Sequence, residues 1–209
     1  MINGLYLITP HGDEADILRT LEHALSGGAR VVQYRDKERD VEAQIKLARR
    51  LGINCRAAGA IFLINDNAEI ALKAEADGVH LGQDDQSVHD ARKLLGPDKL
   101  IGVSTRTVDQ ALQAEAAGAD YIGVGSIFPT ATKEDAKLIG IDALRKIRRA
   151  VQIPLVAIGG VNANNGDEAI DAGADALAVV SAISSDANPA LAARELSLMF
   201  NRKQDIGQT

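Results

Sequence analysis

A cluster of hydroxyl residues and one lysine follows a short apolar segment near the middle of the chain. The segment Tyr121-Ile-Gly-Val has the composition of a buried strand, and Pro129 stiffens the turn that comes after it. Thr130, Thr132 and Lys133 then bring two hydroxyl donors and one flexible cation close together. Phosphate oxygens accept hydrogen bonds from hydroxyl groups and pair well with an ammonium ion. This stretch predicts a phosphate-binding loop, and an ordinary polar surface loop is the alternative.

Two cations follow another apolar segment at a spacing of two residues. In Gln33-Tyr-Arg35-Asp-Lys37, the alternation of a strand puts Gln33, Arg35 and Lys37 on one side and Tyr34 and Asp36 on the other. If Gln33 points inward, both cations emerge on the same side where the strand ends. An ordinary charged loop is again the alternative interpretation.

Amide and acidic side chains follow two further apolar segments. Asn65 and Asp66 end one of them, and Asp85 comes shortly after the other. Helix capping is one role for such residues, although Ser87 could cap the helix after Asp85 equally well. Two carboxylates on adjacent strand ends, opposite two cations, are harder to explain by capping alone. Because a carboxylate pair holds Mg²⁺ when a diphosphate completes its ligands, Asp66 and Asp85 predict a magnesium site.

Small and hydroxyl residues follow three more segments. Thr107 is the expected helix cap after one of them, which leaves the Ser104 hydroxyl for another partner. Gly159-Gly160 and Val180-Ser181 follow the last two, and each turn is expected to open a short helix. Small residues let backbone N–H groups approach a phosphate closely. The sequence therefore predicts two anion sites, and the simplest ligand pair is a diphosphate ester and a phosphate monoester.

The elements that must carry these residues alternate along the whole chain. Short apolar runs rich in branched residues, typical of strands buried on both faces, alternate with helical patterns. Eight such units predict a single (β/α)8 TIM barrel, whose functional residues collect after the carboxyl ends of the strands. A doubly wound sheet is the alternative, but it usually carries fewer strands. The expected strands are residues 5–9, 29–34, 61–65, 78–81, 100–104, 121–125, 155–159 and 176–181.

Composition and the chain ends limit the other possibilities. The chain is 46% hydrophobic but 3% aromatic, so the core must be aliphatic, and we expect one domain over residues 1–209. A final helix is expected at 190–201, and residues 203–209 are expected to be a frayed tail. The net charge of −6 and the absence of a basic stripe argue against nucleic acid as a partner. No apolar run approaches the roughly 20 residues of a membrane span.

The cysteine content and the first residues predict the cellular location. The single cysteine, Cys55, excludes an intrachain disulfide and is expected to be a half-buried structural thiol on a helix. The start of the chain lacks the pattern of a secretory signal. We therefore expect a cytoplasmic protein that acts on small molecules, and the sequence predicts no particular oligomeric state.

Taken in order, these motifs resemble those of the thiamine-phosphate synthase family, over nearly the whole chain to Pro189. Each motif is weak alone, but their order and spacing together are specific. The family has proline where this chain has Ser126, a position that we interpret as structural. The motifs are Gln33-x-Arg35-x-Lys37, Asn65-Asp66, His80-x-Gly82-Gln83-x-Asp85, Gly102-Val-Ser104, Gly123-x-Gly125-x-Ile127-x-Pro129-Thr130-x-Thr132-Lys133, Gly159-Gly160 and Val180-Ser181-Ala182-Ile183.

The resemblance implies a transferase that couples a hydroxymethylpyrimidine diphosphate to a hydroxyethylthiazole phosphate. It implies one Mg²⁺, held by Asp66 and Asp85, and a pyrimidine contact from Gln33. Cations would stabilise the charge that develops on the departing diphosphate, so no protein nucleophile is expected. The implied diphosphate ligands are Arg35, Lys37, Asn65, Ser104 and Lys133, of which Arg35, Ser104 and Lys133 would be catalytic. The implied thiazole phosphate ligands are Thr130, Thr132, Gly160, Val180 and Ser181.

Two other functions compete with this interpretation. A sugar-phosphate epimerase or isomerase would share the predicted phosphate turns but would not need two cations opposite two carboxylates. A paralogue that binds thiazole phosphate as a tautomerase or regulatory module would lack the Thr-x-Thr-Lys loop or an acidic motif. His80 is either an acid–base residue or a packed spacer, and residues 129–137 are a candidate lid.

Overall fold

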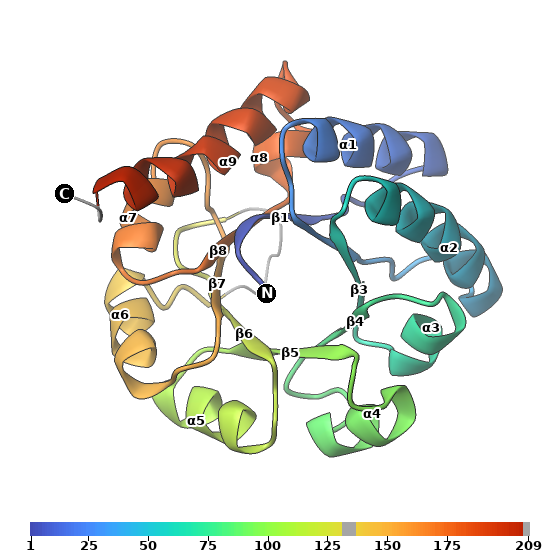
Figure 1. The fold of residues 1–209 in the computed structure, drawn as a ribbon, viewed down its shortest axis with the longest axis horizontal. Helices are drawn as coiled ribbons and strands as arrows, with labels where there is room; N and C mark the ends of the chain where they lie inside the picture. Colours follow the sequence, from blue (N-terminus) through green and yellow to red (C-terminus); the bar gives the residue numbers. More distant parts are fainter. Residues whose placement is uncertain (131–136, 207–209) are drawn as a thin grey trace.

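Eight parallel strands form a closed barrel in the computed structural model, which describes residues 1–130 and 137–206. Each strand pairs with the next, and β8 pairs with β1 to complete the ring (Figure 1). The eight predicted strands are therefore confirmed, most with ends that differ by one or two residues. The strands are β1 Gly4–Ile8, β2 Val31–Tyr34, β3 Ile61–Asn65, β4 Gly78–Leu81, β5 Leu100–Thr105, β6 Tyr121–Val124, β7 Leu155–Ile158 and β8 Ala176–Val179.

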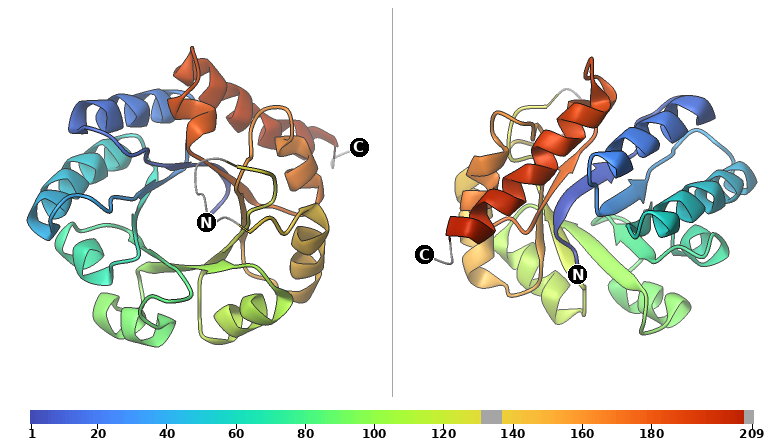
Figure 2. Two further views of the ribbon diagram at one scale, coloured as in Figure 1. Left: turned by 180° about the vertical axis from the view of Figure 1, so that it is seen from behind. Right: turned by 45° about the horizontal axis from the view of Figure 1, so that its top comes forward.

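The helices surround this barrel on its outside, as the views in Figure 2 show. One helix follows each strand, and a further helix closes the chain by packing against α1 and β1. The fold is thus the predicted (β/α)8 TIM barrel. The helices are α1 Glu14–Ser26, α2 Val41–Ala57, α3 Ala68–Lys73, α4 Val88–Leu95, α5 Val108–Ala116, α6 Ile141–Ala150, α7 Gly166–Asp171, α8 Ser181–Ser184 and α9 Pro189–Ile206.

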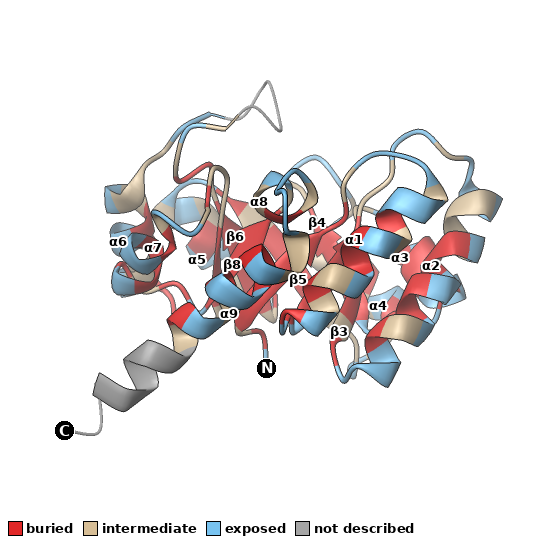
Figure 3. Ribbon diagram, turned by 90° about the horizontal axis from the view of Figure 1, so that it is seen from above, coloured by how far each residue is buried: buried red, intermediate tan, exposed pale blue. Residues whose placement is uncertain are grey.

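Two separate hydrophobic cores stabilise the barrel. The larger core lies between the strands and the helices, and it includes Leu5, Leu7 and Val32. The smaller core fills the barrel interior with side chains such as Tyr6 and Tyr121. Alternate residues of one strand therefore enter different cores, as the pleat requires. Figure 3 shows the buried residues gathered on the strands and on the inward faces of the helices.

Helix caps in the described structure come from residues beside the predicted site residues. Asn67 accepts a hydrogen bond from the Ile70 amide and caps α3, so Asp66 does not perform this role. Ser87 caps α4 in place of Asp85. Thr107 caps α5, as predicted. The neighbouring carboxylates are consequently available for another interaction.

The expected short helix after β7 is present as α7, which begins at Gly166, and Asn162 and Asn165 both bond to the Gly160 carbonyl in the turn before it. Two other local expectations were wrong. Cys55 is fully rather than half buried, since it lies on the inward face of α2 in the outer core. Helix α9 continues to Ile206 instead of ending at residue 201. The rest of the predicted tail, 207–209, lies outside the described residues.

Across residues 1–130 and 137–206, no helix combines the length and the apolar character that a bilayer crossing requires.

Two glycines make room for the large polar side chains inside the barrel. A β-carbon at Gly102 would overlap the ring of Tyr121, which lies directly opposite in the β5–β6 register. A β-carbon at Gly123 would come within 3.1 Å of the His80 ring. Both positions therefore need glycine for close approach rather than for backbone freedom.

Replacing Gly102 with alanine should destabilise the barrel because the fully buried Tyr121 ring has little space to move. We expect a loss of about 3 kcal/mol in the free energy of unfolding, the upper range for overpacking. The control is Gly118→Ala, where φ is +87° and nothing lies within 4 Å of the added carbon. That variant should lose about 1 kcal/mol from backbone strain alone. Urea denaturation measures both values, and equal losses would contradict the crowding argument.

Candidate active site

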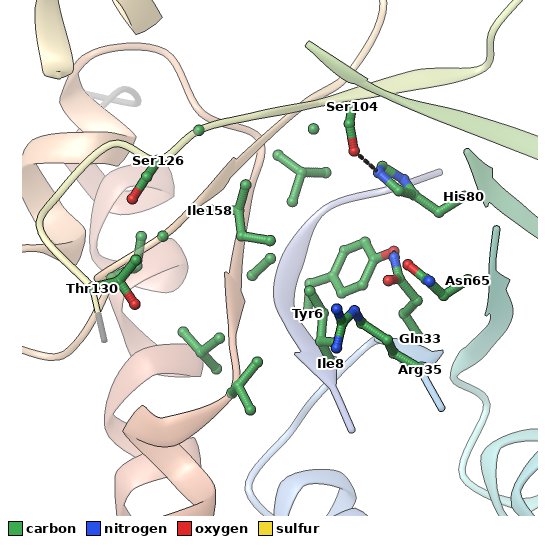
Figure 4. A pocket seen from close by; sticks show the side chains of 18 of the residues that line it. Tyr6, Ile8, Gln33, Arg35, Asn65, His80, Ser104, Ser126, Thr130 and Ile158 are labelled. Carbon is green, nitrogen blue, oxygen red and sulfur yellow. Dashed lines mark hydrogen bonds between the residues drawn. The ribbon is translucent and has the colours of Figure 1, made fainter. Parts of the chain in front are cut away.

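A cavity of about 720 Å³ opens at the carboxyl ends of the strands. It receives side chains from loops that are far apart in the sequence. Figure 4 shows Gln33, Arg35 and Asn65 on one wall and Ser126 and Thr130 on the other. All predicted site residues within the described ranges line it: Gln33, Arg35, Lys37, Asn65, Asp66, Asp85, Ser104, Thr130, Gly160, Val180 and Ser181.

The two cations after β2 lie on the cavity side, as the alternation predicted. Arg35 donates from Nη1 toward Nε2 of His11 at 2.8 Å, and its backbone N–H bonds to Thr9 at 3.0 Å. Lys37 Nζ lies 3.9 Å from Asp66 Oδ2. His11 also lines the cavity, and the sequence motifs gave no sign of this.

Asp36 holds the loop between these two cations in position. Its carboxylate accepts hydrogen bonds from the Glu38 and Arg39 amides at 3.0 Å each and from the Tyr34 hydroxyl at 2.9 Å. Burial alone would raise the pKa of Asp36, but these hydrogen bonds outweigh burial and lower it to about 2. Asp36 thus remains ionised and fixes the backbone that carries Arg35 and Lys37.

The carboxylates of Asp66 and Asp85 lie close enough to influence each other. Burial and, after it, the neighbouring Asp85 carboxyl together raise the pKa of Asp66 to about 6, against the opposing effects of Lys37 and Asn65. Asp85 accepts a 2.6 Å hydrogen bond from the Gly82 amide, which orients its side chain. A pair of oxygen ligands that repel each other is suited to a divalent cation.

The donor set is compatible with magnesium that takes most of its ligands from elsewhere. No group of three or more His, Cys, Asp or Glu side chains forms a metal site within the parts of the chain that the structure describes. Mg²⁺ is commonly bound by one or two carboxylates together with water and substrate phosphates. Asp66 and Asp85 therefore fit such an ion when a bound anion completes the ligands.

Five polar side chains form a continuous hydrogen-bonded chain across the barrel interior. Gln33 Nε2 donates to the Tyr6 hydroxyl at 2.7 Å, and the Tyr6 and Tyr121 hydroxyls are 3.0 Å apart. His80 Nδ1 lies 2.8 Å from the Tyr121 hydroxyl, and His80 Nε2 lies 2.9 Å from Ser104 Oγ. Burial lowers the pKa of His80 to about 4, although the charge of Asp85 opposes this shift, so the imidazole is neutral near pH 7.

The motifs in the sequence assigned no role to Tyr6 or Tyr121, the two tyrosines of this hydrogen-bonded chain. Both lie on strands in apolar surroundings, where they resemble core residues. The alternation of side chains along β1 and β6 could have identified them. It places both tyrosines inside the barrel, where a hydroxyl must find a polar partner.

The opposite wall is built from backbone turns. Gly159 and Gly160 have φ values of +93° and +69°. A β-carbon at Gly160 would overlap the Pro129 carbonyl and approach Phe128, so this glycine lets the β7 turn pack against the loop after β6. The Phe128 amide bonds to the Gly159 carbonyl at 2.9 Å, and Ser126 Oγ bonds to the Phe128 carbonyl at 2.6 Å.

Two predicted ligands lie outside the residues that the structure describes. Thr132 and Lys133 lie outside the described residues, and so does most of the candidate lid at 129–137. Thr130 and Lys137 flank this gap, and both line the cavity. The described residues on both sides of this gap therefore reach the site.

Comparisons with known proteins identify the family. The family described as "Thiamine monophosphate synthase" matches residues 5–183. The thiamine-phosphate synthase of Moorella thermoacetica is 48% identical over 201 residues, covering 95% of this chain and 96% of that protein. The "thiamine biosynthesis bifunctional protein ThiED" of Geobacter sulfurreducens is 50% identical over 97% of this chain, which spans 41% of its length.

Solved structures agree with this assignment. A thiamine phosphate pyrophosphorylase from Pyrococcus furiosus superimposes with a TM-score of 0.87 at 36% identity, covering 95% of this chain and 96% of that chain. A 3-hexulose-6-phosphate synthase matches with a TM-score of 0.70 at 20% identity, which shows a shared fold alone. The family match over residues 5–183, the similar sequences and the similar solved structure together show that this chain belongs to the thiamine monophosphate synthase family.

Proposed function

We propose that the protein joins a hydroxymethylpyrimidine diphosphate to a hydroxyethylthiazole phosphate in a Mg²⁺-dependent reaction that releases diphosphate. Family membership makes it a transferase that synthesises thiamine phosphate. We propose the identity of the two substrates, the metal and the residue roles. We also propose that residues 1–209 act as one domain in the cytoplasm.

One observation carries this proposal above the others. The cavity lining differs by strand: cations and carboxylates come from the loops after β2, β3 and β4, whereas uncharged, mostly small residues come from the turns after β7 and β8. Arg35 and Lys37 belong to the first wall, whereas Gly160 and Ser181 belong to the second. A diphosphate and a monophosphate would therefore bind at opposite sides, and the reacting carbon and nitrogen would meet between them.

The first wall would bind the pyrimidine diphosphate. Arg35 would donate to its oxygens, Lys37 would contribute a second positive charge, and Asn65 and Ser104 would contribute neutral donors. Gln33, in the cavity floor and 3% exposed, would bind the pyrimidine ring. From the sequence pattern alone, Lys133 would add a further cation from the loop after β6.

Asp66 and Asp85 would hold the single Mg²⁺. When bound, the ion would offset negative charge on the departing diphosphate. The two carboxylates would each supply oxygen ligands, and their mutual repulsion would favour the state with the ion bound over the state without it. Lys37, 3.9 Å from Asp66, would compensate part of that charge before the substrate arrives.

The second wall would bind the thiazole phosphate. Backbone N–H groups at Gly160, Val180 and Ser181 and the Thr130 hydroxyl are suited to an anion, because glycine and small side chains leave the backbone accessible. Thr132 would add a second hydroxyl on sequence grounds. No cation is required there, since a monoester can be bound by neutral donors alone.

The coupling needs no covalent intermediate with the protein. The bond between the pyrimidine methylene carbon and the diphosphate oxygen breaks, and its electron pair leaves with the diphosphate. The electron-rich aminopyrimidine delocalises the positive charge left on the carbon, and the thiazole nitrogen then forms the new bond. Cys55 supports this view, because its thiol is fully buried away from the cavity and burial raises its pKa to about 12.

The direct test is product formation. Purified protein with both substrates and Mg²⁺ should release thiamine phosphate and diphosphate in equal amounts, and omission of any one component should stop the reaction. A folded preparation that binds both phosphates but forms no thiamine phosphate would refute the proposed function.

Replacing Asp85 with alanine should weaken Mg²⁺ binding by about tenfold to a hundredfold, because one of two protein ligands is lost. Calorimetric titration of Mg²⁺ in the presence of inorganic diphosphate measures this without turnover. The matched control is Asp98→Ala, which removes an exposed carboxylate from the opposite end of the barrel. Unchanged Mg²⁺ affinity in Asp85→Ala would contradict the metal assignment.

Replacing Ser181 with aspartate should separate the two anion sites. The new negative charge would repel the thiazole phosphate at the start of α8 and weaken its binding by about a hundredfold or more. Binding of the pyrimidine diphosphate with Mg²⁺ should change by less than about threefold. Ser185→Asp, at the other end of this four-residue helix, controls for added charge. Equal loss of both ligands would argue against two separate sites.

A further inference from the structure

The hydrogen-bonded chain beneath the cavity has a geometry that restricts where each hydrogen can lie. Gln33, Tyr6, Tyr121, His80 and Ser104 are linked in that order, with neighbouring atoms between 2.7 and 3.0 Å apart. Tyr6 and Tyr121 are 1% and 0% exposed, so water cannot replace a missing partner.

Each hydroxyl in the chain has a single hydrogen to donate. A neutral imidazole likewise carries one N–H and one acceptor nitrogen. If every link is to contain one hydrogen, all hydrogens must point the same way along the chain. A break in this order would leave a buried hydroxyl hydrogen without an acceptor, which costs about 1–3 kcal/mol as an unsatisfied group.

Two directions satisfy this condition, and the geometry at Gln33 selects one of them. The Gln33 amide donates from Nε2 to Tyr6, which starts the sequence of hydrogens at Gln33. Because that link already contains a hydrogen, the Tyr6 hydrogen is directed to Tyr121, and the same order continues through His80 to Ser104.

We propose that Tyr121 is a positioning residue that holds His80 as its Nε2–H tautomer, so that the Ser104 hydroxyl hydrogen donates into the cavity. Tyr6 donates to Tyr121, Tyr121 donates to His80 Nδ1, and His80 Nε2–H donates to Ser104. Ser104 is the last member, and its own hydrogen is left for a ligand.

The direction of the chain selects the chemistry of that ligand. Ser104 then requires a hydrogen-bond acceptor, and the oxygens of a diphosphate meet this requirement. At the other end, Gln33 has used one of its two N–H groups toward Tyr6, and this orientation of the amide leaves Oε1 for a ligand donor such as an exocyclic amine. The identity of the ligand rests on the proposed function, whereas the direction of the chain does not.

Tyr121 is suited to a test because it is fully buried and does not line the cavity. Tyr121→Phe removes one hydroxyl at the midpoint and keeps the ring that fills the space over Gly102. Tyr34→Phe is the matched control, since it also removes a buried tyrosine hydroxyl but one that bonds to Asp36 at 2.9 Å.

The tautomer can be read directly in the wild-type protein without ligand. Long-range ¹H–¹⁵N correlation spectra distinguish a protonated ring nitrogen from an acceptor nitrogen, and loss of signals in His80→Asn assigns them. We expect Nε2 of His80 to be protonated and Nδ1 to be an acceptor, unchanged in Tyr34→Phe and altered in Tyr121→Phe. A His80 protonated at Nδ1 in the wild type would overturn the proposal, and this arm requires no folded variant of Tyr121.

A double-mutant cycle separates positioning from general stability. Tyr121→Phe should lower kcat about tenfold with KM changed less than about twofold, and should have less than a twofold effect in the Ser104→Ala background. Equal effects in both backgrounds would mean that Tyr121 does not act through Ser104 and would overturn the proposal. A wild-type protein that makes no thiamine phosphate would instead refute the proposed function and leave the His80 tautomer as the decisive measurement.

Discussion

Pairing between β1 and β8 closes the sheet, and the cavity depends on this one set of hydrogen bonds. The register runs from Gly4 opposite Ala176 to Leu7 opposite Val179. Closure brings all eight strand ends to one rim, so that loops more than a hundred residues apart in sequence share a cavity. An open sheet would keep the two walls of the site apart. The chemistry of the protein therefore depends on backbone pairing between its first and last strands, which also carry cavity-lining residues such as Tyr6 and Val179.

In the loops at the carboxyl ends of the strands, helix caps and candidate site residues are different neighbouring residues. Parallel strands end in polar residues, and a helix must begin a few residues later, so each loop needs both a helix cap and the functional groups. Asn67, Ser87 and Thr107 supply the caps in three of these loops. Asp66 and Asp85 are thereby spared a structural role. Burial and the neighbouring Asp85 carboxyl then raise the pKa of Asp66 above its usual value.

The barrel interior resolves a different conflict, between apolar packing and polar recognition. A buried polar group is costly unless it is hydrogen-bonded, and the floor of the cavity contains several of them. Tyr6, Tyr121 and His80 satisfy one another in a chain, and two glycines leave room for their rings. The interior thus connects the two ends of the first wall, Gln33 and Ser104, through three buried groups.

The sequence by itself determined the number and order of the elements, because apolar runs and helical periodicity are local properties of the chain. It also identified the polar residues at the strand ends, including Arg35, Asp66 and Ser104, since each follows directly from where a strand stops. The bounds of helices followed less directly from the sequence, since α9 extends to Ile206 and α7 begins only at Gly166.

Only the tertiary structure decided which of these residues meet and how their protons are shared. Tyr6 and Tyr121 are 115 residues apart, yet their hydroxyls lie 3.0 Å from each other. The need for Gly160 likewise arises from the approach of the Pro129 backbone on another loop. Contacts of this kind depend on barrel closure and strand register, and no local pattern in the sequence encodes the distance between two side chains on separate strands.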